Sequence, residues 1–141
     1  MKSSQIAVLE RVRQAQNAHD LEAFLACFAP GYQSDQPLHP DRAFQGVEQV
    51  RKNWSALFHE VPDLRSELLG SAVEGDTAWA EWRWSGTRRD GTSFDMRGVT
   101  IMSIQADQIK SARLYMEPVQ EAGAGIDAAV TNLTHRSPQE R

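Results

Sequence analysis

The sequence predicts an α+β domain, with helices in the first half of the chain and an antiparallel sheet in the second. Up to Pro62, apolar residues recur at the three- and four-residue spacing of a helix face. Beyond Pro62 the spacing becomes two, which is typical of strands with one buried face, and short turn sequences separate the runs. Helices followed by strands exclude a doubly wound parallel sheet, in which the two kinds of element alternate.

Three helices are predicted before Pro62. The first covers Ser4–Ala18, with Ser3 or Ser4 as its N-cap, and Asp20 can cap a second, short helix over residues 21–28. The Pro30-Gly31 pair is expected to stop that helix. A short strand over residues 32–36 and an ordered loop or lid over residues 37–41 follow. The third helix runs over residues 47–61, between Gly46 and Pro62.

The second half predicts four strands, over residues 65–71, 77–87, 93–106 and 109–119. Successive side chains of a strand point to opposite faces, so one face of each strand meets the helices. Within residues 77–87, that face carries Ala78, Ala80, Trp82 and Trp84.

The end of the chain has a different composition. A stretch rich in Gly and Ala leads to Ile126, Val130 and Leu133, whose spacing suits one or two helical turns. We therefore expect one domain over residues 1–119 and an extension over residues 120–141. The last eight or so residues are expected to be mobile.

Composition excludes several classes of function. The 141 residues carry a net charge of -4, which disfavours nucleic acid as a partner. The single cysteine, Cys27, allows no intrachain disulfide and suits a reducing compartment, so we expect a cytoplasmic protein. No apolar run approaches the ~18 residues of a membrane span. The histidines lack metal-ligand spacing, so we expect no metal and no cofactor.

Several strings in the chain carry a resemblance to a known family. In order, they are FAPGYQSDQP, PDLR, EGDTAWAEWRWSGTRRDG, RGVTIMSI and IKSARLYMEP. Together, over roughly residues 5–119, they resemble the nuclear transport factor 2-like superfamily, in particular its SnoaL-like branch. The resemblance implies a cone-shaped α+β barrel, with three helices in the hollow of a bent sheet and a pocket between them. The superfamily includes ketosteroid isomerases, polyketide cyclases, dehydratases, epoxide hydrolases and domains that only bind or dimerise, so the fold does not give the function.

Strand positions carried over from the resemblance predict the lining of this pocket. The lining is apolar and aromatic with few polar groups, which is typical of a small-molecule site, although the same side chains could simply fill a core. The predicted ligand-binding residues are Tyr32, Gln36, Trp54, Phe58, Trp82, Trp84, Thr100, Met102, Leu114 and Met116. Phe24, on the second helix, is expected to help close the pocket.

The chain departs from the isomerases at two positions that carry chemistry. Gln36 stands where they have the general base, and an amide cannot accept a proton at neutral pH. Thr100 stands where they have a protonated acid that donates to an oxyanion. Two other candidates for catalysis are Asp35, which a regular strand would turn away from the pocket, and His39 in the proline loop. Their structural interpretations are a turn-stabilising carboxylate and a solvated histidine.

The opposite face of the predicted sheet mixes apolar and charged side chains. A solvated face rarely carries so many large apolar groups, whereas a two-fold interface between back-to-back sheets uses them. We therefore expect a homodimer, unless the segment with Ile126, Val130 and Leu133 folds back over this face. The expected interface residues are Trp79, Glu81, Arg83, Ile101, Arg113 and Tyr115.

Three functions agree with these features. The first is a SnoaL-like protein that binds a small hydrophobic molecule through Gln36 and Thr100, with no assigned activity. The second is an isomerase, cyclase or dehydratase acting on a hydrophobic carbonyl or polyketide-like substrate. In it Asp35 or His39 would transfer the proton, and Tyr32 or Thr100 would polarise a carbonyl. The third is a non-catalytic dimerisation domain.

Overall fold

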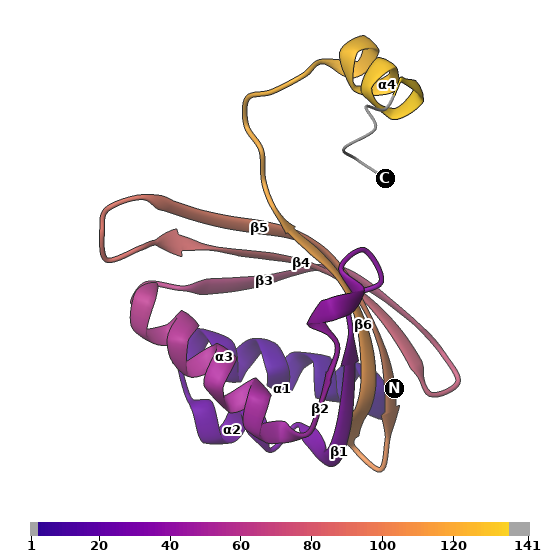
Figure 1. Cartoon of the computed structure of the whole chain (residues 1–141). Helices are drawn as coiled ribbons and strands as arrows, with labels where there is room; N and C mark the ends of the chain where they lie inside the picture. Colours follow the sequence, from indigo (N-terminus) through magenta and orange to yellow (C-terminus); the bar gives the residue numbers. More distant parts are fainter. Residues whose placement is uncertain (1–2, 136–141) are drawn as a thin grey trace.

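The computed structural model describes residues 3–135 of the chain, which form four α-helices, one short 3-10 helix and one six-stranded sheet. Three helices lie against one face of a curved sheet, and the fourth stands apart (Figure 1). The helices are α1 (Ser4–Ala18), α2 (Leu21–Leu25), α3 (Val47–Glu60) and α4 (Ile126–Thr134), and the 3-10 helix is Pro40–Arg42. The strands are β1 (Phe28–Asp35), β2 (Phe44–Gln45), β3 (Arg65–Glu74), β4 (Thr77–Thr87), β5 (Ser93–Gln105) and β6 (Gln108–Pro118).

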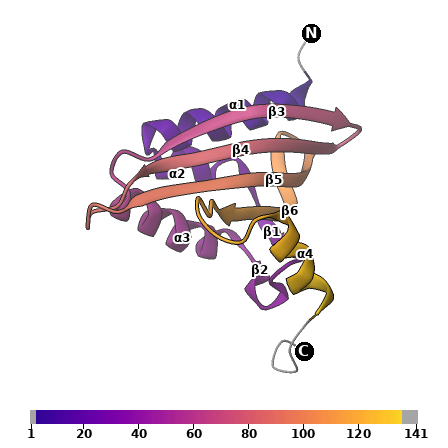
Figure 2. The same cartoon turned by 90° about the horizontal axis from the view of Figure 1, so that it is seen from above.

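The sheet is mixed and stays open. Its strand order is β2-β1-β6-β5-β4-β3, and β1 and β6 are parallel while every other pair is antiparallel. The α+β class and the bent sheet around helices are confirmed. The barrel is not closed, because β2 and β3 lie at the two edges and do not pair with each other (Figure 2).

Local sequence signals start the first two helices as predicted. The Ser3 side chain accepts a hydrogen bond from the Ile6 amide at 3.1 Å, and Asp20 caps α2 by accepting from the Ala23 amide at 3.0 Å. Each cap satisfies a backbone N–H that the first turn of a helix leaves without a partner. The buried face of α1 then packs on β3 and on α2.

The second helix is shorter than predicted, and the strand that follows begins earlier. Helix α2 ends at Leu25, and Pro30 lies inside β1 instead of stopping the helix. The pairing of β1 with β6 shifts register between Phe28 and Gln33, so Pro30 falls in the irregular stretch of the strand. A proline is tolerated there because the ladder does not need its missing N–H.

The close approach of β5 to β6 depends on one glycine. Gly98 has φ +155, and a Cβ built on it would lie 1.8 Å from the carbonyl oxygen of Tyr115 on β6. Only a residue without a side chain allows the two backbones to approach this closely.

The final helix leaves the body of the molecule. Helix α4 stands clear of the sheet, and Ile126, Val130 and Leu133 remain exposed (Figure 1). The segment therefore does not fold back over the outer sheet face. Of the last eight residues, expected to be mobile, residues 136–141 lie outside the described part of the chain. No helix within residues 3–135 is long and apolar enough to cross a membrane.

Candidate functional site: an uncharged cavity between sheet and helices

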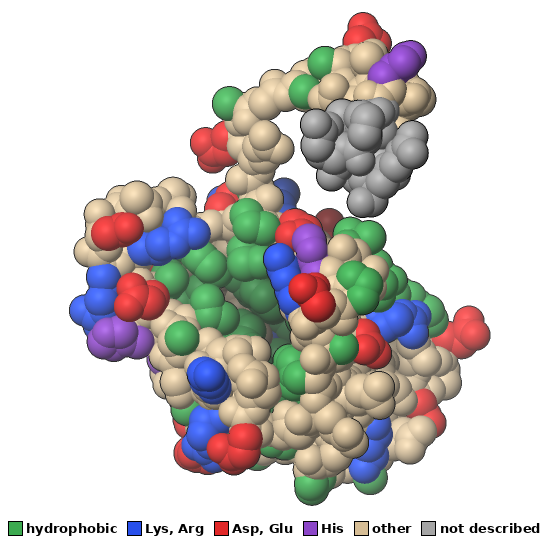
Figure 3. Space-filling model, viewed as in Figure 1, with side chains coloured by type: hydrophobic (Ala, Val, Ile, Leu, Met, Phe, Trp, Pro, Cys, Tyr) green, Lys and Arg blue, Asp and Glu red, His purple; other side chains and the backbone are tan. Residues whose placement is uncertain are grey.

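A cavity of about 90 Å³ lies between the first three helices and the concave face of the sheet. Figure 3 shows hydrophobic side chains at the bottom of a hollow on this side of the molecule. Its lining residues come from α1, α2, α3 and five strands: Val12, Gln16, Phe24, Phe28, Tyr32, Ser34, Gln36, Phe44, Val50, Asn53, Trp54, Trp82, Trp84, Thr100, Met102 and Leu114.

Most of the predicted ligand-binding residues line this cavity. Phe58 does not, because its ring stacks on His19 with centroids 4.7 Å apart. Met116 is buried in the core away from the lining. The eight that the fold brings together are Tyr32, Gln36, Trp54, Trp82, Trp84, Thr100, Met102 and Leu114.

The sequence analysis found Phe24 as well but left out seven of the sixteen lining residues. Ser34 follows from alternation, because it lies between Tyr32 and Gln36 on one face of β1 and its continuation. Gln16 lies one turn after Val12 on the buried face of α1, and that spacing is the signal that could have found it. The residues missed are Val12, Gln16, Phe28, Ser34, Phe44, Val50 and Asn53.

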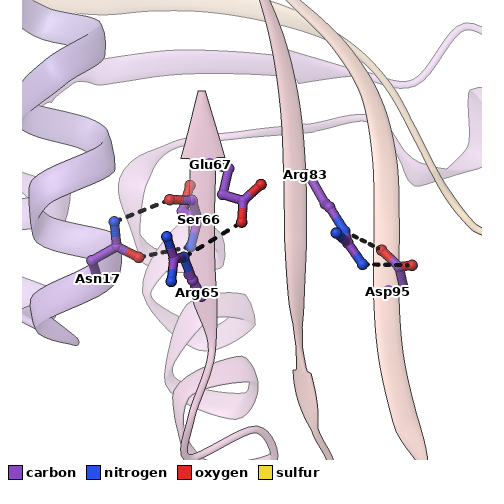
Figure 4. A network of polar contacts seen from close by, with 6 residues as sticks. All are labelled: Asn17, Arg65, Ser66, Glu67, Arg83 and Asp95. Carbon is purple, nitrogen blue, oxygen red and sulfur yellow. Dashed lines mark hydrogen bonds and ion pairs between the residues drawn. The ribbon is translucent and has the colours of Figure 1, made fainter. Parts of the chain in front are cut away.

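Hydrogen bonds hold α1 against β3 at one end of the cavity. The Asn17 side chain accepts from the Ser66 amide at 2.7 Å and donates to the Ser66 carbonyl at 3.0 Å (Figure 4). The Ser66 hydroxyl donates to Oε1 of Gln16 at 2.6 Å. Edge strand β3 thus gains polar partners on the helix, and Gln16 is oriented by a buried bond.

The two tryptophans on the inner face of β4 differ in their hydrogen bonding. Trp82 donates from Nε1 to Oγ1 of Thr100 at 2.9 Å. Trp84 has no acceptor for its Nε1–H among the described residues, although the atom is buried. Its ring stands edge to face with Trp54, with centroids 5.1 Å apart. A buried donor without a partner is uncommon in folded proteins.

Tyr32 is the only lining residue that titrates, and it is neutral at physiological pH. Burial raises the pKa of its phenol to about 12, against a lowering by the Ser34 hydroxyl and with a small further rise from the charge of Asp35. The other lining side chains are aliphatic, aromatic, amide or hydroxyl groups. The cavity therefore carries no charge, and its polar groups offer hydrogen bonds rather than proton transfer.

The two catalytic candidates lie outside the lining. Asp35 pairs in register with Arg113 and borders the outer face of the sheet. His39 contacts Oε1 of Glu117 at 2.5 Å and ties the proline loop to β6. Gln36 lies at the rim, where Arg42 donates to its Oε1 at 3.1 Å. Among residues 3–135, no group of His, Cys, Asp and Glu side chains could hold a metal ion.

An open, bent sheet around three helices with a cavity between them defines the nuclear transport factor 2-like class of α+β domains. A model of the SnoaL-like domain matches residues 9–112 of this chain. The chain therefore belongs to the SnoaL-like family. A search of curated protein sequences finds none that matches it.

Solved structures show the same fold. A candidate SnoaL-like polyketide cyclase from Jannaschia sp. CCS1 superposes with a TM-score of 0.69 at 20% identity, over 97% of this chain and 99% of that chain. TsrD from Streptomyces laurentii superposes with a TM-score of 0.68 at 22% identity, over 84% of this chain and 90% of that chain. A third structure is a protein from Catenulispora acidiphila with a ketosteroid isomerase-like fold, solved in complex with trimethylamine. It superposes with a TM-score of 0.65 at 15% identity, over 75% of this chain and 82% of that chain.

Proposed function

We propose that this SnoaL-like protein binds a small, uncharged and largely apolar molecule in the cavity between sheet and helices. The observation that carries the proposal is a lining that is aromatic and buried yet contains no charged group. Pockets for small molecules combine apolar walls with a few placed polar groups in this way. An ionised ligand would lose its hydration without gaining an opposite charge.

The cavity volume limits the size of the ligand. At about 90 Å³ it is smaller than an engineered apolar cavity of about 150 Å³ that holds benzene. A steroid or polyketide would fit only if the rim at Gln36, Phe44 and Asn53 opened. We therefore expect the ligand to have a small number of heavy atoms.

Binding is favoured over catalysis by the position of the ionisable groups. An enzyme of the isomerase, cyclase or dehydratase type needs a base within hydrogen-bond reach of its substrate. Asp35 borders the outer face, His39 contacts Glu117, and Gln36 offers an amide. A dimerisation domain without a ligand stays the alternative if the cavity takes no small molecule.

The proposal is tested by blocking the cavity. A panel of small neutral ketones, alkenes and aromatics is titrated by ligand-detected NMR against the wild type and Leu114→Trp, which adds volume to the lining. Leu69→Trp is the matched control, because Leu69 lies outside the lining and is 45% exposed. We expect saturable binding to the wild type and control that Leu114→Trp abolishes. Binding of no compound, or equal binding to all three proteins, would refute the proposal.

We also propose that two copies pair through the outer face of the sheet, in a cytoplasmic protein. This face carries two rows of register partners across β4, β5 and β6. One row is Trp79, Ile101 and Arg113, and the other is Glu81, Val99 and Tyr115. Trp79 is 37% exposed, which is unusual for so large an apolar group. Charges of both signs on one face can pair with their counterparts across a two-fold axis. Free, buried Cys27 suits a reducing compartment.

A further inference from the structure

The cavity lining includes an indole donor that has no acceptor among residues 3–135. Trp84 is 7% exposed, and its Nε1–H has no acceptor within the described part of the chain. A buried donor is unfavourable unless it finds an acceptor. The indole of neighbouring Trp82 differs, because its Nε1–H donates a hydrogen bond to Thr100 Oγ1 at 2.9 Å.

A second donor lies in the same lining. Gln16 is 2% exposed, and the Ser66 hydroxyl donates to its Oε1, which leaves the Nε2 hydrogens for the cavity. Among residues 3–135 no acceptor bonds to that nitrogen. Ser66 is the register partner of Trp84 across β3 and β4, and directly opposed residues point to the same face. Gln16 and Trp84 therefore both neighbour Ser66, and both line the cavity.

We propose that this donor pair, Trp84 Nε1–H and Gln16 Nε2–H, binds an uncharged oxygen acceptor of the ligand, of the carbonyl or ether class. This inference rests on the proposed function and adds the chemistry by which the cavity selects its ligand. A carboxylate is disfavoured because no lining residue is cationic. The edge-to-face contact with Trp54 offers the indole only a weak π acceptor, which an oxygen atom outcompetes.

The test compares two probes of the same shape, cyclopentanone and methylenecyclopentane, which differ only in the oxygen. Binding is followed by two-dimensional nitrogen–proton correlation NMR on protein that carries nitrogen-labelled tryptophan. The indole signal of Trp84 is the one that disappears in Trp84→Phe. We expect the ketone to bind the wild type roughly tenfold more tightly than the alkene and to shift this signal. The alkene should leave it in place.

Matched variants show which donor groups cause the preference for the ketone over the alkene. Trp84→Phe keeps an aromatic ring but removes the donor, and Gln16→Met removes the amide, so each should bring the two affinities close together. Trp79→Phe removes an indole that lies outside the lining and is 37% exposed, so it should keep the preference for the ketone. If Trp84→Phe does not fold, two measurements still test the proposal. They are the ratio of ketone to alkene affinity in Gln16→Met and the shift of the wild-type indole signals when the ketone binds.

The outcomes separate the two proposals. Equal binding of ketone and alkene, with the Trp84 signal unmoved, would overturn the donor pair and leave the binding function intact. A preference that both Trp84→Phe and Gln16→Met keep would also overturn it. Binding of neither probe, together with no binding from the wider panel, would overturn the binding function and the donor pair with it.

Discussion

At the scale of single residues, burial decides what the polar groups of the cavity can do. Tyr32 is 4% exposed, and its pKa is raised to about 12, mainly because burial disfavours the phenolate. The phenol therefore stays protonated and can donate a hydrogen bond. In the unfolded chain the same group ionises near its ordinary value of 10.0.

This difference makes folding stability depend on alkaline pH. Between the unfolded and folded pKa values the folded state binds more protons, so stability falls as pH rises. The contribution of Tyr32 is complete below pH 10 and is lost as pH rises toward about 12. We expect the wild type to lose about 1 kcal/mol more than Tyr32→Phe between pH 9 and pH 11, measured by urea unfolding. Equal losses would show that Tyr32 is not desolvated.

The rim residue Gln36 gives a prediction about catalysis. The wild type should not isomerise a β,γ-unsaturated ketone, because an amide cannot accept the proton. Gln36→Asp introduces a carboxylate, but the Arg42 guanidinium that now contacts Gln36 at 3.1 Å would lower the pKa of the new group and weaken it as a base.

We therefore expect only a trace of activity in Gln36→Asp, and a higher rate at neutral pH in Gln36→Asp with Arg42→Gln. Absorbance of the conjugated product measures both. A wild-type rate like that of a dedicated isomerase would contradict this assignment and direct attention to Asp35 and His39.

At the scale of elements, the close pairing of β5 with β6 depends on one glycine. Gly98 adopts φ +155, where other residues are strained, and its missing side chain leaves room for the Tyr115 carbonyl. Gly70 in β3 differs, because a Cβ added there meets no atom within 4 Å.

Gly98→Ala should lower the free energy of unfolding by about 3 kcal/mol or more, since it combines overlap with backbone strain. Gly70→Ala should change it by less than about 1 kcal/mol. Urea unfolding of both variants gives the comparison. A small effect at Gly98 would mean that the sheet relaxes without cost at this contact.

At the scale of the whole molecule, two apolar surfaces are without partners in one copy of the chain. The outer sheet face carries Trp79 and Ile101, and α4 presents Ile126 and Leu133, which are 77% and 76% exposed. A nine-residue helix is marginal in water without packing, so a second copy would stabilise α4 as well as cover the sheet.

We expect sedimentation at micromolar concentration to give twice the 15.8 kDa of one chain. Ile101→Glu should halve this mass and keep the far-ultraviolet helical signal, because the buried charge would lack a partner in the interface. Leu38→Glu is the matched control, since Leu38 lies in the proline loop and is 64% exposed. A monomeric wild type would refute the dimer.

Much of the fold could be predicted because its signals are local. The caps at Ser3 and Asp20 and the alternation around Trp82 involve residues a few positions apart. The length of α2 could not be predicted, because Pro30 is accommodated by a register shift between β1 and β6, and β6 lies far along the chain. The pairing of β2 with β1 is equally non-local, and two residues carry too little pattern to predict a strand.

The sequence by itself determined the order of the elements, the inner face of β4 and the absence of a carboxylate at Gln36. These properties depend on residue types and on spacing along the chain. Tertiary structure alone decided that Gln16 meets Ser66, that His39 meets Glu117, and that Trp84 has no acceptor among the described residues. The two bonded pairs are 50 and 78 positions apart in the chain, and a hydrogen bond forms or fails within a few tenths of an ångström.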